Sequence, residues 1–173
     1  MLKTLTTERL VLRPIVTADT QWITDTVQAP EIYRNVARIP AQQSFEETEA
    51  FVKSTKEGAE TATDMVRMVE CDDERIGVIG LNRTHALEPF TLGYWFHPDV
   101  WGNGYATEAA SAVMDWADGF ATPRYYVSGH FADNPASGAV LRKLGFLPCW
   151  RAPVFCQGRE EKVDHLYMSR MAE

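Results

Sequence analysis

The sequence predicts an α+β fold, in which helices flank a mixed and mostly antiparallel sheet. Runs rich in β-branched, aromatic and other apolar residues follow one another at 65–71, 76–82 and 91–97, as is typical of consecutive antiparallel strands. A helical pattern over 107–118 then leads to another strand-like run at 124–131. Because strand, helix and strand in this order form a right-handed crossover, the strands at 91–97 and 124–131 are predicted to lie parallel.

Length and composition predict one domain over residues 1–173, because 45% hydrophobic residues suffice for a core of that size. The N-terminus has no apolar stretch of signal-peptide length, and no apolar run is long enough to span a membrane. We therefore expect a soluble, cytoplasmic protein with no membrane partner. The formal net charge of −7 argues against nucleic acid as a partner and is compatible with amines or basic peptides.

The cysteines and histidines predict neither a disulfide framework nor a metal site. The cysteines form no Cys-x-x-Cys pair, and their number is odd, so free thiols are expected. The histidines are scattered without the spacing of metal ligands. The residues are Cys71, Cys149 and Cys156, and His85, His97, His130 and His165.

The N-terminal third predicts a strand followed by helices. Alternation over 8–15 indicates a strand with one wet face that ends near Pro14. Thr17 is the predicted cap of a first helix. The sequence 44–47, Ser-Phe-Glu-Glu, has the form of a capping box for a second helix, which is expected to end at Gly58.

Another helix and a hairpin are predicted near the C-terminus. Asn134 is the expected helix cap, Pro135 fits the first helical position, and Gly145 fits the position just past the end. Apolar alternation then predicts two strands, at 147–155 and 162–171, that pair as a hairpin.

The most informative stretch is 91–110, which predicts a strand, a glycine turn and a helix. Gly102 and Gly104 allow backbone dihedrals that a Cβ would forbid, and the first turn of the helix has amide N–H groups without helical partners. Together they form a suitable site for a phosphate group. A glycine pair on its own fits a plain turn equally well. There is no P-loop pattern, and Thr107 replaces the third glycine of the dinucleotide fingerprint.

This turn, Trp-Gly-Asn-Gly-Tyr-Ala at 101–106, resembles motif A of the GNAT superfamily of acyl-CoA-dependent N-acetyltransferases, although no Gln or Arg precedes the glycines. The stretch 134–146 resembles motif B of the same superfamily. The block from Gly93 to Ala109 looks most like the branch that acetylates N-termini of ribosomal proteins, at alanine or serine. The resemblance covers nearly the whole chain and implies the GNAT fold, with the sheet splayed between its two central parallel strands.

The resemblance also implies how acetyl-CoA, the acetyl donor, is held. Main-chain amides of the glycine turn would bind the diphosphate, the strand before the turn would pair with the pantetheine arm, and the motif B helix would add side-chain contacts. The implied cofactor-binding residues are Trp95, Phe96, His97, Trp101, Gly102, Asn103, Gly104, Tyr105, Ala106, Thr107, Asn134 and Ser137.

For catalysis, the resemblance implies Ser137 as the group that assists departure of the thiolate, because Leu141 occupies the position of the tyrosine that many family members use. Ser137 could instead be only a first-turn helix residue. Candidates for the general base are Glu88, His97 and His130, of which His130 is the best placed, at the carboxyl end of its strand. Ordered water is an equally acceptable base.

The predicted function is therefore acetyl-CoA-dependent N-acetylation of a primary amine, with a protein or peptide N-terminus as the leading acceptor. A small amine, such as an amino acid, polyamine or aminoglycoside, is the alternative acceptor. A catalytically silent acyl-CoA-binding module is the rival from another class. The chain is expected to be a monomer or a homodimer, without a metal.

Overall fold

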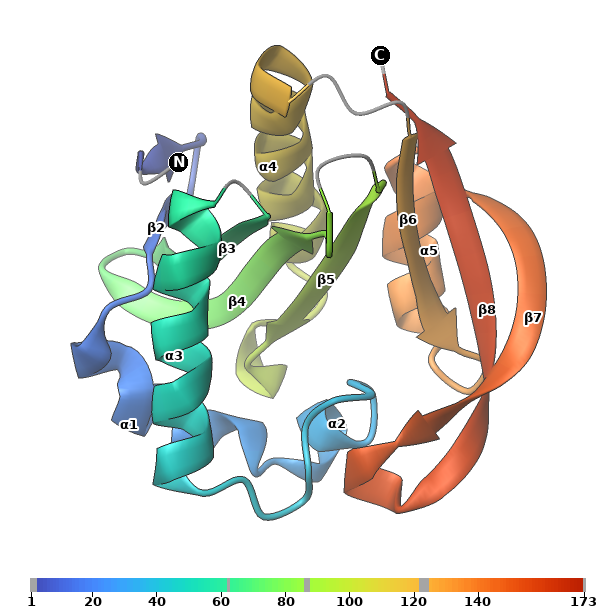
Figure 1. The fold of residues 1–173 in the computed structure, drawn as a ribbon, viewed down its shortest axis with the longest axis horizontal. Helices are drawn as coiled ribbons and strands as arrows, with labels where there is room; N and C mark the ends of the chain where they lie inside the picture. Colours follow the sequence, from blue (N-terminus) through green and yellow to red (C-terminus); the bar gives the residue numbers. More distant parts are fainter. Residues whose placement is uncertain (1–2, 62, 86–87, 122–124, 173) are drawn as a thin grey trace.

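The computed structural model describes residues 3–61, 63–85, 88–121 and 125–172, and its strands form one continuous sheet. The order across the 8-stranded sheet is β1-β2-β3-β4-β5-β6-β8-β7 (Figure 1). The strands are β1 (Leu5–Thr6), β2 (Val11–Pro14), β3 (Asp64–Cys71), β4 (Glu74–Asn82), β5 (Phe90–Phe96), β6 (Tyr125–Phe131), β7 (Leu147–Cys156) and β8 (Glu161–Met171). The predicted strand start at Arg124 lies outside the described residues.

The helices cover both faces of this sheet. They are α1 (Thr20–Val27), α2 (Pro30–Tyr33), α3 (Phe45–Glu60), α4 (Tyr105–Ala121) and α5 (Pro135–Lys143), with short 3-10 turns η1 (Thr17–Asp19), η2 (Pro98–Val100) and η3 (Gln157–Arg159). In Figure 1, α1 and α3 lie on one face, and α4 and α5 lie on the other. Within the described ranges, no helix is both long and apolar enough to cross a bilayer.

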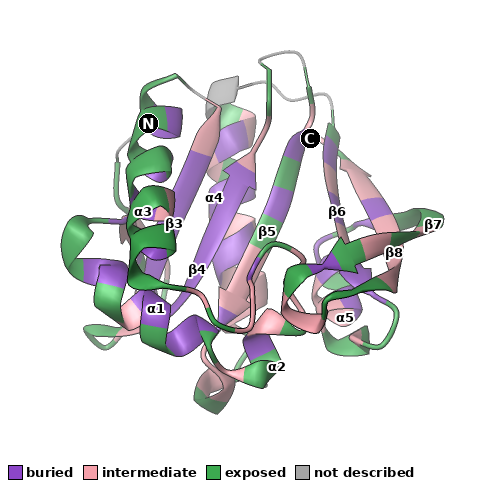
Figure 2. Ribbon diagram, turned by 60° about the horizontal axis from the view of Figure 1, so that its bottom comes forward, coloured by how far each residue is buried: buried purple, intermediate pink, exposed green. Residues whose placement is uncertain are grey.

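Strand alternation divides the core into two layers, one on each face. Val78 points toward α1 and α3, where it joins Ile23 and Val52 in one cluster. Its neighbour Ile79 points the other way and joins the cluster that contains Met114 of α4. Because successive strand residues face opposite sides, a continuous apolar run can be buried on both faces. Figure 2 shows the central strands β3 and β4 as the most continuously buried part of the sheet.

The runs at 65–71 and 76–82 form a hairpin, β3 and β4, as their order predicted, and its turn has two residues where four separate the two runs. Asp72 and Asp73 have φ values of 51° and 64°, and Cys71 pairs with Glu74. Two residues with positive φ are the pattern of a two-residue turn that matches the twist of its strands. Aspartate tolerates this conformation better than most residues.

The parallel pair is also confirmed, and it is very short. β5 and β6 pair only at Phe90 with Tyr126 and at Thr91 with Val127. Beyond these positions the strands diverge, as Figure 1 shows. β6 instead pairs along its full length with β8, from Tyr125 to Phe131. The sheet is therefore splayed at the predicted position.

The helix boundaries agree with the sequence in part. The capping box is confirmed, because Glu47 N–H donates to the Ser44 hydroxyl at 3.1 Å and Ser44 N–H donates to the Glu47 carboxylate at 2.8 Å. The expected end at Gly58 is wrong, since α3 continues to Glu60. Gly58 is required by packing instead, because a Cβ there would lie 2.2 Å from a carboxylate oxygen of Asp64.

Thr17 is not the helix cap that the sequence suggested. It opens η1, and its carbonyl accepts a hydrogen bond from the Thr20 hydroxyl at 2.8 Å. The capping role at this bend belongs to Asp19, whose carboxylate accepts from the Val16 N–H at 2.9 Å. The Asp19 carboxylate also contacts Arg13 and Arg75 on the sheet, whereas the Thr17 side chain makes no such contact.

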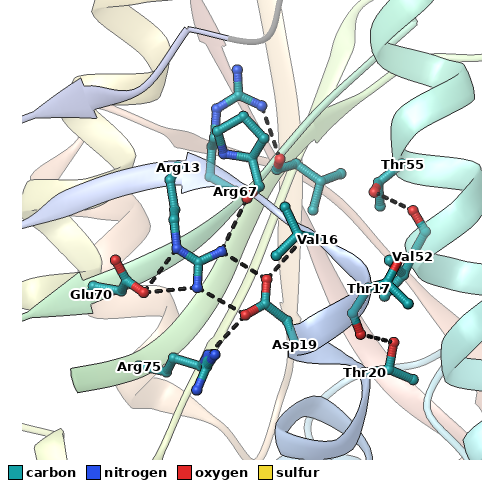
Figure 3. Close-up of polar contacts among 12 residues, drawn as sticks. Arg13, Val16, Thr17, Asp19, Thr20, Val52, Thr55, Arg67, Glu70 and Arg75 are labelled. Atoms are coloured by element: carbon teal, nitrogen blue, oxygen red, sulfur yellow. Dashed lines mark hydrogen bonds and ion pairs between the residues drawn. The ribbon is translucent and has the colours of Figure 1, made fainter. Parts of the chain in front are cut away.

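Asp19 is the centre of a charged cluster that ties η1 to three strands (Figure 3). Its side chain is fully buried, and its two carboxylate oxygens accept hydrogen bonds from Arg13 at 2.7 and 2.8 Å and from Arg75 at 2.8 Å. Arg13 also pairs with Glu70 at 2.8 Å. Burial raises the pKa of Asp19, but the hydrogen bonds from Arg13, the Val16 N–H and Arg75 outweigh burial and lower the pKa overall.

Asp19→Asn is expected to lower the free energy of unfolding by about 3 kcal/mol, because it places a neutral amide at a fully buried position where two partly exposed guanidinium groups converge. Chemical denaturation at pH 7 measures this loss. Glu57→Gln is the control, because Glu57 is 63% exposed and only 3.9 Å from Lys53. Its effect should stay within about 0.5 kcal/mol.

The stability difference between the native protein and Asp19→Asn is also expected to depend on pH. A carboxyl whose pKa is lowered in the native state contributes stability above its unfolded pKa, which is about 4, and loses it as the pH falls through the native value. The stability difference between the native protein and Asp19→Asn should therefore shrink as the pH is lowered below about 4. A difference that does not change with acid would contradict an ionised, charge-paired Asp19.

Candidate active site

The glycine turn has the geometry of an anion site. Gly102 and Gly104 have φ values of +82° and +81°, in the region that side chains with a Cβ rarely occupy. The Glu108 N–H donates to the Gly104 carbonyl at 3.1 Å, as in the first bond of a helical ladder. The N–H groups at 105–107 precede that bond and therefore lack helical partners. They point toward a negative group placed at the N-terminus of α4.

Trp101 braces this turn from the end of β5. Its N–H donates to the Pro98 carbonyl at 3.1 Å, and its indole N–H donates to the Phe96 carbonyl at 2.9 Å. The predicted contribution of the Trp101 amide to the phosphate site is thus at odds with the structure, because this N–H is already used. Asn103 further supports the turn, since its side-chain amide donates to the Val100 carbonyl at 3.0 Å.

Arg9 and Glu108 clamp the turn to the N-terminal segment. The Glu108 carboxylate accepts from the Thr7 hydroxyl at 2.5 Å and from Arg9 Nε at 2.8 Å, and it lies 2.6 Å from Arg9 Nη2. Arg9 also donates to the Asn103 carbonyl at 3.0 Å, and its guanidinium lies 4.6 Å from the centre of the Tyr105 ring. The sequence placed Arg9 only on the wet face of a strand, so this role was missed.

Beyond Thr91, one edge of β5 faces the gap that opens toward β6. The His97 N–H donates to the Ile76 carbonyl of β4 at 2.8 Å, and Trp95 pairs with Val78. In an antiparallel pair, alternate residues direct their backbone groups to the same neighbour. The backbones of Trp95 and His97 therefore face β4. Pairing with an extended ligand in the gap falls to the backbone of Tyr94 and to the N–H of Phe96, whose carbonyl already accepts from the Trp101 indole.

The first turn of α5 reaches across the same gap. Asn134 caps the helix as predicted, because its side chain accepts from the Ser137 N–H at 3.2 Å. The Ser137 hydroxyl lies 2.9 Å from the Tyr94 hydroxyl, which also donates to the Ser137 carbonyl at 3.2 Å. Burial raises the pKa of Tyr94 to about 12, although the hydrogen bond with Ser137 acts to lower it. Leu141 is fully buried in the core and presents no polar group.

Tyr94 was missed by the sequence analysis. The sequence places Tyr94 in the strand before the glycine turn, and this position indicates only a β-forming aromatic residue. Its contact with Ser137 joins residues 43 positions apart and depends on how far the strands diverge.

The predicted base His130 is enclosed between β6 and α5. Its side chain is 7% exposed, and its Nδ1 lies 2.8 Å from the Phe131 carbonyl. A Cβ added at Gly138 of α5 would come within 2.5 Å of His130 Nε2, so the ring fills the space beneath the helix. The structure thus brings His130 to the underside of the first turns of α5, where little of its side chain is exposed. Its catalytic role stays a prediction.

The other two candidate bases lie apart from each other. Glu88 is exposed in the connection before β5, where its carboxylate accepts from the Thr84 N–H at 3.2 Å. His97 lies at the opposite end of β5, beside the glycine turn, and its Nδ1 accepts from the Asp99 N–H at 3.3 Å. Glu88 is thus a full strand length from the turn.

A row of rings crosses the C-terminal part of the sheet on the opposite face from His130. His165 packs edge-on against Phe131 and Tyr167, with ring centres 5.5 and 4.5 Å apart, and Tyr167 stacks on Trp150 at 4.5 Å. Burial and the nearby charge of His130 lower the pKa of His165. Its Nδ1 is buried and has no hydrogen-bond partner among the described residues. The sequence analysis had assigned His165 no role.

Together these features suit the transfer of an acyl group from a thioester. Such a reaction requires an anchored donor, hydrogen-bond donors for the developing oxyanion and stabilisation of the departing thiolate. The glycine turn, the free edge of β5 and Ser137 follow one another along the gap between β5 and β6. No group of His, Cys, Asp and Glu suited to a metal ion occurs among residues that the structure describes.

A family model described as the acetyltransferase (GNAT) domain matches residues 9–147. The chain belongs to the GNAT acetyltransferases. GNAT enzymes transfer an acetyl group from acetyl-CoA to an amine, so this chain is an acetyl-transferring enzyme and acetyl-CoA is its donor substrate. The glycine turn and the open edge of β5 fit that donor, because they offer N–H groups to a diphosphate and backbone pairing to an extended arm. The silent-module alternative is therefore set aside.

Relatives support the same family. The chain is 31% identical over 157 residues to the uncharacterized N-acetyltransferase YoaA of Bacillus subtilis, covering 84% of each chain. It is 32% identical over 81 residues to a ribosomal-protein-serine acetyltransferase of Escherichia coli, covering 46% of this GNAT chain and 45% of that protein. The structure of RimL, a ribosomal L7/L12 α-N-protein acetyltransferase in complex with coenzyme A, superposes with a TM-score of 0.86 at 19% identity over 98% of both chains. At that identity the superposition shows a shared fold.

Gly102→Ala is expected to raise the Kd for acetyl-CoA about tenfold. A Cβ at positive φ costs roughly 1–2 kcal/mol, which the turn can relieve only by moving the amides out of line. Isothermal titration calorimetry with acetyl-CoA measures the change. No atom lies within 4 Å of the added Cβ, so a steric clash would not explain the result.

Gly119→Ala is the matched control, on the helix that follows the glycine turn. Gly119 lies in α4 and also has no atom within 4 Å of an added Cβ, but its φ is not positive. Alanine should leave the Kd unchanged and stabilise the helix by about 1 kcal/mol. Equal Kd values for native protein and Gly102→Ala would show that the dihedral at 102 does not shape the site.

Proposed function

We propose that this GNAT enzyme acetylates the N-terminal amine of a protein or peptide, with ribosomal proteins as the leading class of acceptor. The observation that carries the chemistry is the alignment of the glycine turn, the open edge of β5 and Ser137 along one gap. The choice of acceptor is supported by the similarity to the ribosomal-protein-serine acetyltransferase and by the fold shared with RimL. The net charge of −7 is compatible with a basic protein partner.

In this proposal the main chain anchors the donor. The amides of Gly102, Asn103 and Gly104 and those at 105–107 bind the diphosphate, and the backbones of Tyr94 and Phe96 align the arm beside β5. A free N–H on that edge would meet the oxyanion as it develops. Asn134 holds the first turn of α5 in place, and Ser137 faces the departing sulfur.

The amine must lose a proton before or during its attack. His130 is the base that the sequence favours, although it is enclosed. His165 is a second candidate, because its buried Nδ1 has no hydrogen-bond partner among the described residues and could accept a proton. Ordered water remains the third route.

A small amine is the second candidate for the acceptor. The microcin C7 self-immunity acetyltransferase MccE, solved with acetyl-CoA and AMP, shares the fold with a TM-score of 0.82 at 15% identity. That neighbour was solved with a nucleotide as well as acetyl-CoA, which supports a small molecule as the alternative acceptor.

A panel of amines with acetyl-CoA tests the acceptor. The panel contains synthetic peptides that begin with Ser or Ala, the same peptides with a formylated N-terminus and an internal lysine, and small amines such as spermidine. We expect release of free thiol with the open N-termini and a mass-spectrometric signature of acetyl on the first residue. Turnover confined to the small amines, or acetylation of lysine in the blocked peptides, would overturn the proposed acceptor.

A further inference from the structure

The hydroxyl groups of Tyr94 and Ser137 meet across the gap of the sheet. Backbone pairing between β5 and β6 ends at Thr91 and Val127, and Tyr94 lies beyond that point on β5. Its hydroxyl is 2.9 Å from the Ser137 hydroxyl and 3.2 Å from the Ser137 carbonyl, both in the first turn of α5. The pair therefore bridges the two halves of the sheet where they have separated.

Only certain arrangements of the two hydroxyl hydrogens are possible. The Ser137 carbonyl can only accept, so a Tyr94 hydrogen directed to it leaves Ser137 as the donor in the hydroxyl pair. If Tyr94 instead donates to the Ser137 oxygen, the Ser137 hydrogen is free to point to a third group. The second arrangement presents a hydrogen-bond donor toward the gap.

Neither hydroxyl is suited to give its proton away. Burial raises the pKa of Tyr94 to about 12. A thiol has a pKa of about 8.5, so moving a proton from Tyr94 to a thiolate would be unfavourable by a factor of roughly a thousand. The pair can still stabilise a thiolate, because hydrogen bonds to a charged acceptor are stronger than neutral ones.

We propose that Tyr94 is a positioning residue that orients the Ser137 hydroxyl as a hydrogen-bond donor to the departing thiolate. This inference rests on the proposed role of Ser137. As the amine forms its bond to the acetyl carbon, the carbon–sulfur bond breaks and its electron pair stays on sulfur. Ser137 donates to that sulfur, and Tyr94 donates to Ser137. The nitrogen then carries one proton more than an amide, and this proton leaves to the base. The thiolate takes up one proton from solvent water, and the base returns its proton to solvent, so no net charge is left.

In this proposal the hydroxyls of Tyr94 and Ser137 together replace the tyrosine that many family members have at the position of Leu141. The Tyr94 phenol lies on β5 and contacts the first turn of α5 from across the gap. It can therefore orient the Ser137 hydroxyl although it does not belong to α5. Ser137 is held from two directions in this arrangement, by Asn134, which accepts from its N–H, and by Tyr94, which donates to its hydroxyl oxygen.

The direct test is the thiol pKa of coenzyme A bound to the enzyme, followed by the ultraviolet absorbance of the thiolate. No acceptor amine is needed. The native enzyme should lower the pKa of the bound thiol below its value in free coenzyme A. Ser137→Ala and Tyr94→Phe should each reduce this shift by about one unit, a tenfold change in thiolate stabilisation. The double variant should resemble Ser137→Ala, because Tyr94 acts through Ser137.

Tyr126→Phe is the matched control. Tyr126 is a buried phenol on the neighbouring strand, and its hydroxyl donates to Asp118 at 2.6 Å. Its loss should lower stability without changing the thiol pKa. With an amine acceptor, Tyr94→Phe should lower kcat and leave the KM for the amine unchanged, since the proposed role of Tyr94 is exerted on Ser137 and not on the amine.

Each outcome separates the two hypotheses. A shift that Ser137→Ala removes and Tyr94→Phe leaves intact would overturn the role of Tyr94 alone. Additive losses in the double variant would mean that Tyr94 acts independently of Ser137. If neither variant changes the thiol pKa, the thiolate role of Ser137 fails together with the inference. Failure of every peptide acceptor would change the proposed substrate and leave this measurement unaffected.

Discussion

The separation of β5 from β6 is the constraint on which the active site depends. Each strand is fully paired on its other side, β5 with β4 and β6 with β8, so each belongs to its own half of the sheet. Two pairs of residues and the Ser128 hydroxyl, which donates to the Leu92 carbonyl at 2.8 Å, connect the halves before they diverge. Backbone groups that lack partners cost free energy unless another group satisfies them. An extended ligand in the gap would recover that loss.

Two polar clusters fix the position of the N-terminal half of the chain relative to this gap. The cluster around Asp19 joins η1, β2, β3 and β4, and thus fixes the strand that pairs with β5. The clamp of Arg9 on Glu108 joins the segment before β2 to the first turn of α4. The glycine turn is thereby fixed by Arg9, which contacts both Asn103 in the turn and Glu108 in α4. This matters because glycine itself adds no rigidity.

Local signals in the sequence predicted much of this structure. The capping box at Ser44, the boundaries around α5 and the glycine turn each depend on residues within a few positions of one another, where sequence and backbone conformation are tightly coupled. The contacts that complete the site are long-range. Arg9 meets Glu108 across 99 positions, and Tyr94 meets Ser137 across 43. Strand register also decides which backbone groups of 94–97 face the gap. A shift of one residue would turn the backbones of 95 and 97 to the gap and those of 94 and 96 to β4.

In the proposed site, recognition through the backbone would make the missing Gln or Arg of motif A dispensable. A diphosphate bound by amide N–H groups needs a chain path with two positive φ values and a helix that begins at the right point, and the turn has both. Side chains then act on the turn instead of on the ligand. Trp101 anchors it to Phe96, and Arg9 anchors it to the N-terminal segment. In the proposed mechanism the same division of labour extends to α5, where Asn134 and Tyr94 contact Ser137 and Ser137 contacts the departing sulfur.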